Sequence, residues 1–260
     1  MTANELLARF SEQQVAAFFL VLARVSPLFI LAPLFSSKMI PGRVRSIIAV
    51  GLTVGLMPVV KHGAIDLDPL AYGGMIVKEV VVGLAFAYAL AAMFAGLQVA
   101  GSLLDTLIGF SFGSLVDPVT GNQSTVISQL YSLFGVAILI AIGGDAWIIK
   151  GLARTYEVIG IDQTPAIGTL VAGASHAFAS IFLSAIQVAG PIILALILTD
   201  AAFGVVSRVV PQMNIFAVGF PAKLIVGLVL LGASLPFVSN FFIGSLQDSV
   251  GQALHFLKVA

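Results

Sequence analysis

Long stretches without charged residues divide the chain into candidate membrane helices. The stretches are Val15–Phe35, Ser46–Val60, Val80–Leu104, Pro118–Gly144, Gln163–Thr199 and Leu224–Gln247, with Arg24 as the one charged exception. About 20 apolar residues cross a bilayer as an α-helix, because a helix pairs every backbone N–H and C=O within one segment. Ser46–Val60 is short for a full span. The pattern predicts an all-α integral membrane protein with about six apolar helices or hairpins.

Small residues and prolines add detail to these helices. In the third stretch, two rows of small residues recur every four positions: Gly83, Ala87, Ala91 and Ala95, and Ala92, Gly96 and Ala100. Small side chains let helix backbones approach closely, so we expect this face to pack against another helix. Prolines interrupt several stretches and predict kinks: Pro27, Pro33, Pro191, Pro221 and Pro236.

The charged residues are expected in loops between the helices. Ser36–Arg45 carries three basic residues and no acid, so the positive-inside rule places this loop in the cytoplasm. Strict alternation then places Asp105–Thr125 and Asp200–Lys223 on the same side. Lys61–Lys78 and Asp145–Asp162 are expected to be the loops on the other side. Single charges at the edges of the apolar stretches are taken as solvated or interfacial helix boundaries: Lys78, Glu79, Asp105, Asp117, Asp200, Arg208 and Lys223.

Composition excludes several classes of protein. The 260 residues are 59% hydrophobic and 9% charged, whereas soluble domains have about 45–50% apolar and about 25% charged residues. Twelve basic and twelve acidic residues cancel, so no basic excess indicates nucleic-acid binding. The chain has no cysteine, which excludes disulfides, thiolate metal sites and cysteine nucleophiles. The start of the chain lacks the basic region of a signal peptide, so we expect the first apolar stretch to remain as a membrane helix.

Few residues suggest catalysis or metal binding. Gly109 to Gly113 spells G-x-S-x-G around Ser111, but that motif acts between a strand and a helix, whereas here it joins two apolar helices. We interpret it as a chance match and keep an intramembrane hydrolase as an alternative. His62, His176 and His255 lack metal-ligand spacing. His176 is interpreted as a buried, hydrogen-bonded histidine, with a proton relay as the alternative. No metal or cofactor is predicted.

Arg24 is the intramembrane polar residue that stands out. A charge at the centre of a membrane helix costs about 2.5–3.5 kcal/mol on insertion scales. Such residues usually face a partner, a cavity or a pathway. We therefore expect Arg24 to face the interior of the protein.

Three stretches together resemble a known family. They are Ala23–Leu52, Ala100–Gly121 and Arg208–Leu224, and PQMNIF followed by GFP-x-K in the last is the most specific. Their order and spacing resemble the FliR family of flagellar export-gate proteins. The SctT family of virulence type III secretion is the near relative.

The resemblance implies a fold, a function and partners. It implies one copy of the chain in a helical assembly with FliP- and FliQ-like subunits, forming the inner-membrane pore for unfolded flagellar proteins. It implies a FliP-like part over about 1–165 and a FliQ-like helical hairpin over 166–260. It also implies contact with FlhA- and FlhB-like export components, residence in the flagellar basal body, and no enzyme activity, cofactor or nucleic acid.

The resemblance also implies two functional segments. The loop matching Leu107–Ser124 acts in the family as a plug in the closed pore, and here it contains Gly109, Phe110, Ser111, Phe112, Asp117 and Pro118. Apolar rings can exclude water and ions from a lumen, although an ordinary interfacial loop would also fit these residues. The second segment is a polar, cytoplasmic turn for assembly, containing Arg208, Pro211, Gln212, Asn214, Phe216 and Lys223.

Two alternatives for the function of the whole chain stay open. One is an SctT-like subunit of a virulence secretion system, because that family shares much of the pattern. The other is a self-contained secondary transporter, which the broken helices and Arg24 favour, although the two halves show no convincing repeat. No phosphate-binding loop is present, so energy would have to come through other subunits.

Overall fold

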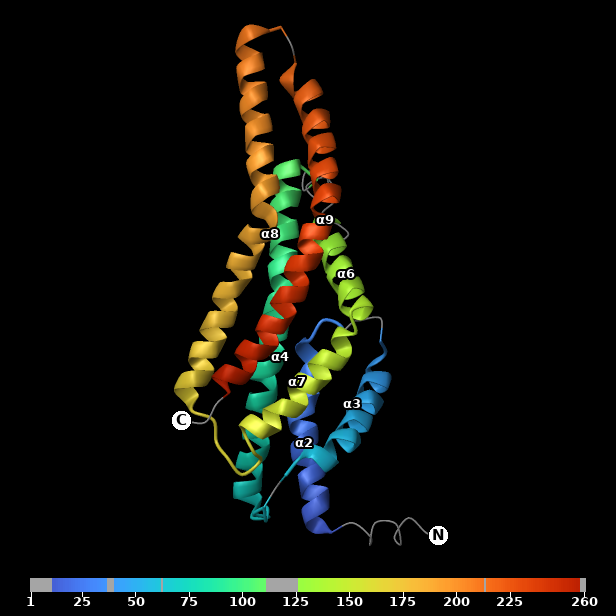
Figure 1. Cartoon of the computed structure of the whole chain (residues 1–260), viewed down its shortest axis with the longest axis vertical. Coiled ribbons are helices and arrows are strands. Elements are labelled where there is room, and N and C mark those ends of the chain that lie inside the picture. Colours follow the sequence, from blue (N-terminus) through green and yellow to red (C-terminus); the bar gives the residue numbers. More distant parts are fainter. Residues whose placement is uncertain (1–10, 37–39, 62, 111–125, 213, 258–260) are drawn as a thin grey trace. The chain divides into compact units, whose positions relative to one another are not determined.

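The computed structural model describes residues 11–36, 40–61, 63–110, 126–212 and 214–257, and within these the chain is helical with no strand (Figure 1). The elements are α2 (Glu12–Leu31), α3 (Gly42–Leu56), the short 3-10 helix η1 (Met57–Val59), α4 (Pro69–Ile108), α6 (Val126–Ala141), α7 (Gly144–Val158), α8 (Ile167–Val209) and α9 (Ile215–Phe256). Among the described residues, five helices are long and apolar enough to cross a membrane, or six if the bent pair α6 and α7 counts as one span. The prediction of an all-α membrane protein is confirmed.

The chain forms two compact units, and each is built from separate stretches of the sequence. Unit 1 comprises residues 1–91, 143–177 and 246–260, and unit 2 comprises 92–142 and 178–245. Three helices, α4, α8 and α9, contribute residues to both units.

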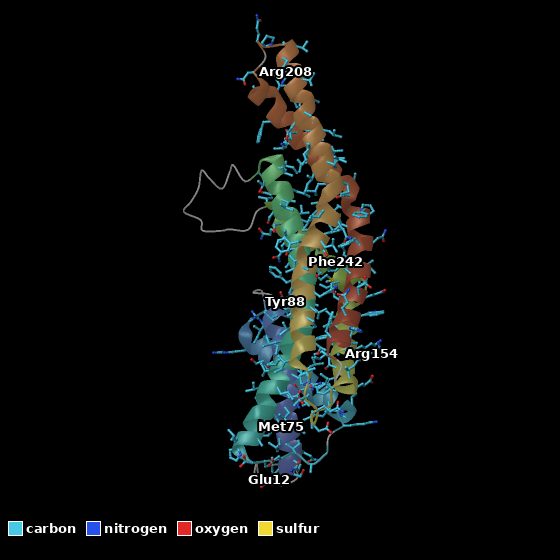
Figure 2. All side chains as sticks on the ribbon, turned by 90° about the vertical axis from the view of Figure 1, so that its left-hand side faces the viewer. Glu12, Met75, Tyr88, Arg154, Arg208 and Phe242 are labelled. Atoms are coloured by element: carbon cyan, nitrogen blue, oxygen red, sulfur yellow. The ribbon has the colours of Figure 1, made fainter. Side chains whose placement is uncertain are left out.

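Unit 1 contains α2, α3, α7 and parts of α4, α8 and α9. The capping box of Ser11 and Gln14 starts α2, because each side chain pairs with a backbone N–H that the first turn leaves free. Glu12 in α2 and Met75 in α4 lie at the same end of the unit (Figure 2). Residues from three separate stretches form a buried apolar cluster: Val82, Ile159 and Leu257.

Unit 2 packs the end of α4 against α6, α8 and α9. The rings of Phe94 in α4 and Phe242 in α9 meet edge to face, with centroids 5.1 Å apart. Arg208 lies at the end of the α8–α9 hairpin (Figure 2). The packing is close enough that a methyl group at Gly101 would lie 2.5 Å from Cα of Ser128.

The rows of small residues in α4 are packing surfaces, as predicted. A Cβ at Gly83 would lie 2.2 Å from the carbonyl oxygen of Arg24 in α2, and one at Gly96 would lie 2.9 Å from Cβ of Ser184 in α8. Ala87 and Ala100 are fully buried. Small residues therefore set the distance between α4 and its neighbours in each unit.

Several predicted loops are wrong because the helices continue through them. Helix α4 begins at Pro69, where the Asp68 side chain accepts from the N–H groups of Leu70 and Ala71 and caps the first turn. Lys78 and Glu79 thus lie inside α4 and do not mark its boundary. Helices pair their own backbone groups, so a single charged residue among apolar ones does not end them.

The same continuation shortens other loops. Most of the predicted loop 145–162 is helix α7, and α3 begins at Gly42, inside the predicted loop 36–45. The residues between α8 and α9 are only 210–214, because α8 continues past Asp200 and α9 begins before Lys223.

Pro27, Pro191, Pro221 and Pro236 lie inside helices, as the sequence predicts, whereas Pro33 follows the end of α2. Gly143, which precedes α7, has a φ of 65°, a left-handed conformation that glycine adopts without steric cost.

Candidate functional site

A buried ion pair joins α2 to α4 in unit 1. Arg24 Nε donates to Glu79 Oε2 at 2.5 Å, and Nη2 donates to Oε1 at 3.1 Å. Both side chains are fully buried. Arg24 Nη1 also donates to the carbonyl oxygen of Ile159 at 2.9 Å and to Oγ1 of Thr155 at 3.4 Å. The guanidinium carbon lies 4.1 Å from the centre of the Tyr156 ring. All three guanidinium nitrogens therefore have hydrogen-bond acceptors, and the Tyr156 ring covers one face of the group.

A second cation extends this network. Lys78 Nζ lies 3.3 Å from Glu79 Oε1 and donates to the carbonyl oxygen of Ile161. The carboxylate of Glu79 thus faces two positive groups. The arrangement holds α2, α4 and the end of α7 together, and Arg24 faces the interior of the protein, as the sequence analysis expected. Glu79 was taken for a solvated helix boundary, and the structure corrects this, since its side chain is fully buried.

A second site lies in unit 2 at the two ends of the predicted plug segment. The side-chain Oδ1 of Asp105 accepts from the backbone N–H of Ile127 at 3.3 Å, in the first turn of α6. The carbonyl oxygen of the same residue accepts from the N–H groups of Gly109 and Phe110 at 3.0 and 3.1 Å. Asp105 is only 1% exposed, so the prediction of a solvated boundary residue is wrong. Asp105 therefore forms hydrogen bonds with residues on both sides of the segment between Phe110 and Ile127.

Most of the predicted plug residues lie outside the part of the chain that the structure describes. Gly109 has a φ of 105°, which only glycine adopts without strain, and Phe110 is half-buried. Ser111, Phe112, Asp117 and Pro118 lie outside the described residues. Their proposed role therefore stays a prediction.

The predicted polar turn is a helix–helix connection in unit 2. Lys223 Nζ donates to Oδ2 of Asp200 at 2.6 Å, which links α9 to α8. The side chain of Asn214 accepts from the N–H of Ala217 at 3.3 Å and caps α9. The other turn residues with described side chains are exposed: Arg208, Pro211 and Gln212. The side chain of Phe216 lies outside the description.

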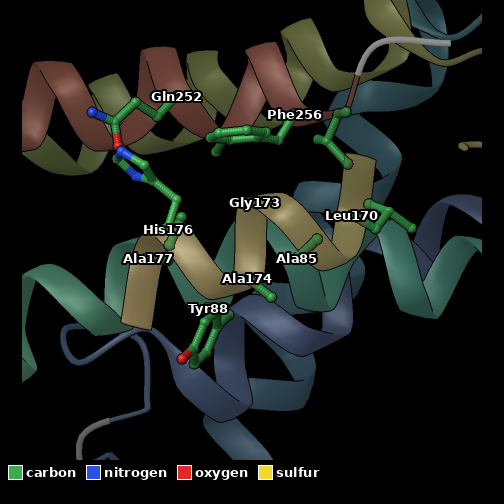
Figure 3. Close-up of a pocket in the computed structure, with 12 residues that line it drawn as sticks. Ala85, Tyr88, Leu170, Gly173, Ala174, His176, Ala177, Gln252 and Phe256 are labelled. Carbon is green, nitrogen blue, oxygen red and sulfur yellow. The ribbon is translucent and has the colours of Figure 1, made fainter. Parts of the chain in front are cut away.

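His176 lines a small cavity of about 40 Å³ in unit 1 (Figure 3). Its ring centroid lies 5.6 Å from that of Phe256, and Gln252 lies beside it in the close-up. The side chain is exposed, which corrects the prediction of a buried histidine. The described residues contain no group of three potential metal ligands.

Sequence reasoning missed Glu79, Asp105, Thr155 and Tyr156. Glu79 and Asp105 were seen only as the edges of apolar stretches. Glu79 was detectable in principle, because it is an acid close to the apolar stretch of α4 and Arg24 needed an acidic partner. Thr155 and Tyr156 gave no such signal, because both lie in a segment predicted to be a loop.

Comparison with known proteins identifies the family. Residues 15–249 match the family of bacterial export proteins, family 1. This match covers most of the chain. The chain belongs to the bacterial export proteins, family 1.

Individual relatives agree with this family of bacterial export proteins. The chain is 32% identical over 219 residues to the flagellar biosynthetic protein FliR of Bacillus subtilis (strain 168), covering 83% of this chain and 84% of the relative. It is 27% identical over 224 residues to FliR of Escherichia coli (strain K12), covering 86% of each. It is 25% identical over 211 residues to the surface presentation of antigens protein SpaR of Salmonella typhimurium, covering 80% of this chain and 79% of the relative. The resemblance to the FliR family is confirmed.

Proposed function

We propose that this chain is a non-enzymatic subunit of the flagellar type III protein export gate, through which unfolded flagellar proteins leave the cell. The observation that carries the proposal is the 32% identity to a flagellar biosynthetic protein over 83% of the chain. Membership of a bacterial export family supports the same function. The expected location is the bacterial inner membrane, in the flagellar basal body.

The length of the hairpin helices supports a role in a larger assembly. Helices α8 and α9 contain 43 and 42 residues. At 1.5 Å per residue each is about 65 Å long, about twice the hydrocarbon thickness of a bilayer. Only 28% of the most apolar part of α8 and 17% of that of α9 are buried. Lipid can cover about half of such a helix, so the remaining apolar surface needs protein partners.

The expected partners are FliP- and FliQ-like subunits, with FlhA- and FlhB-like components beside them. In this proposal residues 1–165 act as a FliP-like part and 166–260 as a FliQ-like hairpin. The turn with Arg208, Gln212 and Asn214 faces the cytoplasm and contacts other subunits. The segment from Gly109 to Pro118 closes the pore, and Asp105 fixes both of its ends.

Co-expression tests this function directly. The chain is produced with its genomic FliP- and FliQ-like neighbours, extracted in detergent, and the mass of the particle is measured. We expect one copy of this chain in a particle of several hundred kilodaltons. A stable particle of this chain alone, in the presence of both neighbours, would contradict the proposal and favour a self-contained transporter.

The virulence alternative has a specific observation behind it, the 25% identity to SpaR. A deletion strain separates the two systems, because loss of motility with intact virulence secretion indicates the flagellar one.

The proposed absence of enzyme activity is tested by a separate variant. A Ser111→Ala variant is expected to export flagellar proteins normally, and loss of a defined hydrolytic activity would support the hydrolase alternative.

A further inference from the structure

Unit 2 carries a row of uncharged polar side chains along one face of α4. Gln98, Ser102 and Thr106 recur every four residues along α4, so they share one face, and Ser132 of α6 borders them. Gln98 and Thr106 are exposed, and the two serines are half-buried. We call these four residues the polar stripe. It contains amide and hydroxyl groups and no charge.

The polar stripe is unsuited to lipid because of Gln98. Its side-chain Nε2 donates to Oγ of Ser132 at 2.9 Å, whereas its side-chain Oε1 has no partner among the described residues. An unsatisfied polar group facing hydrocarbon costs several kcal/mol, because the bilayer core holds no water to bond it. The two α4 hydroxyls are satisfied by their own helix. Ser102 Oγ donates to the main-chain carbonyl of Gln98, and Thr106 Oγ1 donates to the main-chain carbonyl of Ser102.

The exposed face of α8 in the same unit is mostly apolar. Seven of its large exposed side chains between residues 178 and 198 are apolar, and Gln187 is an exposed amide among them; the apolar ones are Phe178, Phe182, Leu183, Ile186, Leu194, Ile197 and Leu198. These suit lipid or the apolar surface of a partner. The exposed face of α8 is thus mostly apolar, with one amide, whereas the polar stripe on α4 consists of amide and hydroxyl groups, and this difference indicates two different environments.

We propose that the polar stripe lines the aqueous export passage and contacts the main chain of the extended polypeptide in transit. The inference rests on the proposed function. The stripe ends one turn before Gly109, so it continues directly from the base of the segment proposed to close the pore. Amides and hydroxyls donate and accept hydrogen bonds, and an extended chain offers an N–H or C=O at every residue apart from the proline N. Uncharged groups of this kind hold a polypeptide without selecting its sequence.

Single cysteines test the stripe, because the chain contains no cysteine of its own. Gln98→Cys, Ser102→Cys and Thr106→Cys are made in the full export complex, in cells where a substrate fused to a stably folded domain is stalled in transit. Two controls have matched positions. Ala100→Cys lies on the buried face of the same helix, and Leu194→Cys lies on the exposed apolar face of α8.

A charged, water-soluble methanethiosulfonate is the probe. We expect it to modify the three stripe cysteines about tenfold faster than either control, because the reactive thiolate forms in water and is suppressed in apolar surroundings. We also expect each stripe cysteine, and neither control, to form a disulfide with a cysteine in the stalled substrate. Modification no faster than at Leu194→Cys would overturn the inference. So would cross-linking of the stripe to a neighbouring subunit in place of the substrate.

The deletion strain separates failure of this inference from failure of the proposed function. If deletion leaves motility intact, the proposed function fails and the inference falls with it. If deletion stops export, and the cysteine variants restore it without cross-linking to substrate, only the inference about the stripe fails.

Discussion

At the scale of single residues, the ion pair of Arg24 and Glu79 is the strongest constraint in unit 1. Both side chains are fully buried. Coulomb attraction between them offsets the loss of hydration only while both are present. Either charged side chain would therefore destabilise the fold if the other were removed.

Glu79→Gln tests this dependence. We expect it to destabilise the chain by about 3–5 kcal/mol, because it leaves Arg24 charged, buried and without a counter-charge. Thermal unfolding of the detergent-extracted chain, followed by the fluorescence of Trp147, measures the effect. The double variant Arg24→Met with Glu79→Leu is expected to recover most of the loss, since neither of the two fully buried charges remains. Equal instability of the single and double variants would refute the ion-pair explanation.

Gly83→Ala tests the close approach of α2 and α4. The added methyl group would overlap the carbonyl oxygen of Arg24, so the two helices must separate. We expect a loss of about 1–3 kcal/mol, the usual cost of overpacking. Gly74→Ala in the same helix is the matched control, because a Cβ there meets nothing within 4 Å. The control is expected to unfold at the wild-type temperature or slightly above it, and an equal loss in both variants would argue against a packing role for Gly83.

At the scale of elements, the start of α9 depends on a side chain from the predicted assembly turn. Asn214 accepts from the N–H of Ala217 and satisfies one of the donors that a helix start leaves free. This capping role and contact with a partner subunit make different demands on the residue. A cap needs only a short side chain with an oxygen acceptor, whereas a partner contact depends on the amide itself.

Two substitutions separate these roles. Asn214→Ala is expected to destabilise the start of α9 by about 1 kcal/mol, because it removes the capping acceptor. Asn214→Ser keeps an acceptor and is expected to retain near wild-type stability. If Asn214 only caps α9, the serine variant assembles with its partners normally in a pull-down. Loss of assembly in both variants would show that the amide contacts another subunit.

At the scale of the whole molecule, the packing units and the proposed functional halves divide the chain differently. Both units combine residues from before and after position 165. In unit 1, Val82 from the first half packs with Leu257 from the second. In unit 2, Phe94 meets Phe242 in the same way. The two proposed halves are therefore joined by packing within each unit.

Splitting the chain between Pro165 and Ala166 tests this interleaving. The cut falls between α7 and α8, outside both helices. We expect either half alone to accumulate at least about fivefold below the intact chain, the effect of losing about 1 kcal/mol or more of stability. Co-expression of both halves is expected to restore protein levels in immunoblots and swarming motility. Normal accumulation of one half alone would mean that it folds without the other.

The sequence by itself determined the class of protein and its family. Charge-free stretches predict membrane helices because a bilayer demands continuous apolar residues, and this demand acts along the chain. The small residues around Gly83 and Gly96 predicted close packing for the same local reason, and the structure confirms it. The motif PQMNIF indicated the family that the comparisons identify.

Only the tertiary structure decided where the charges lie. Glu79 and Asp105 look like solvated helix ends in the sequence, yet both are buried and bonded. The sequence indicated that Arg24 faces the interior, but its acidic partner lies 55 positions away on another helix. The cost of a buried charge depends on the atoms that surround it in space, and spacing along the chain carries no information about them.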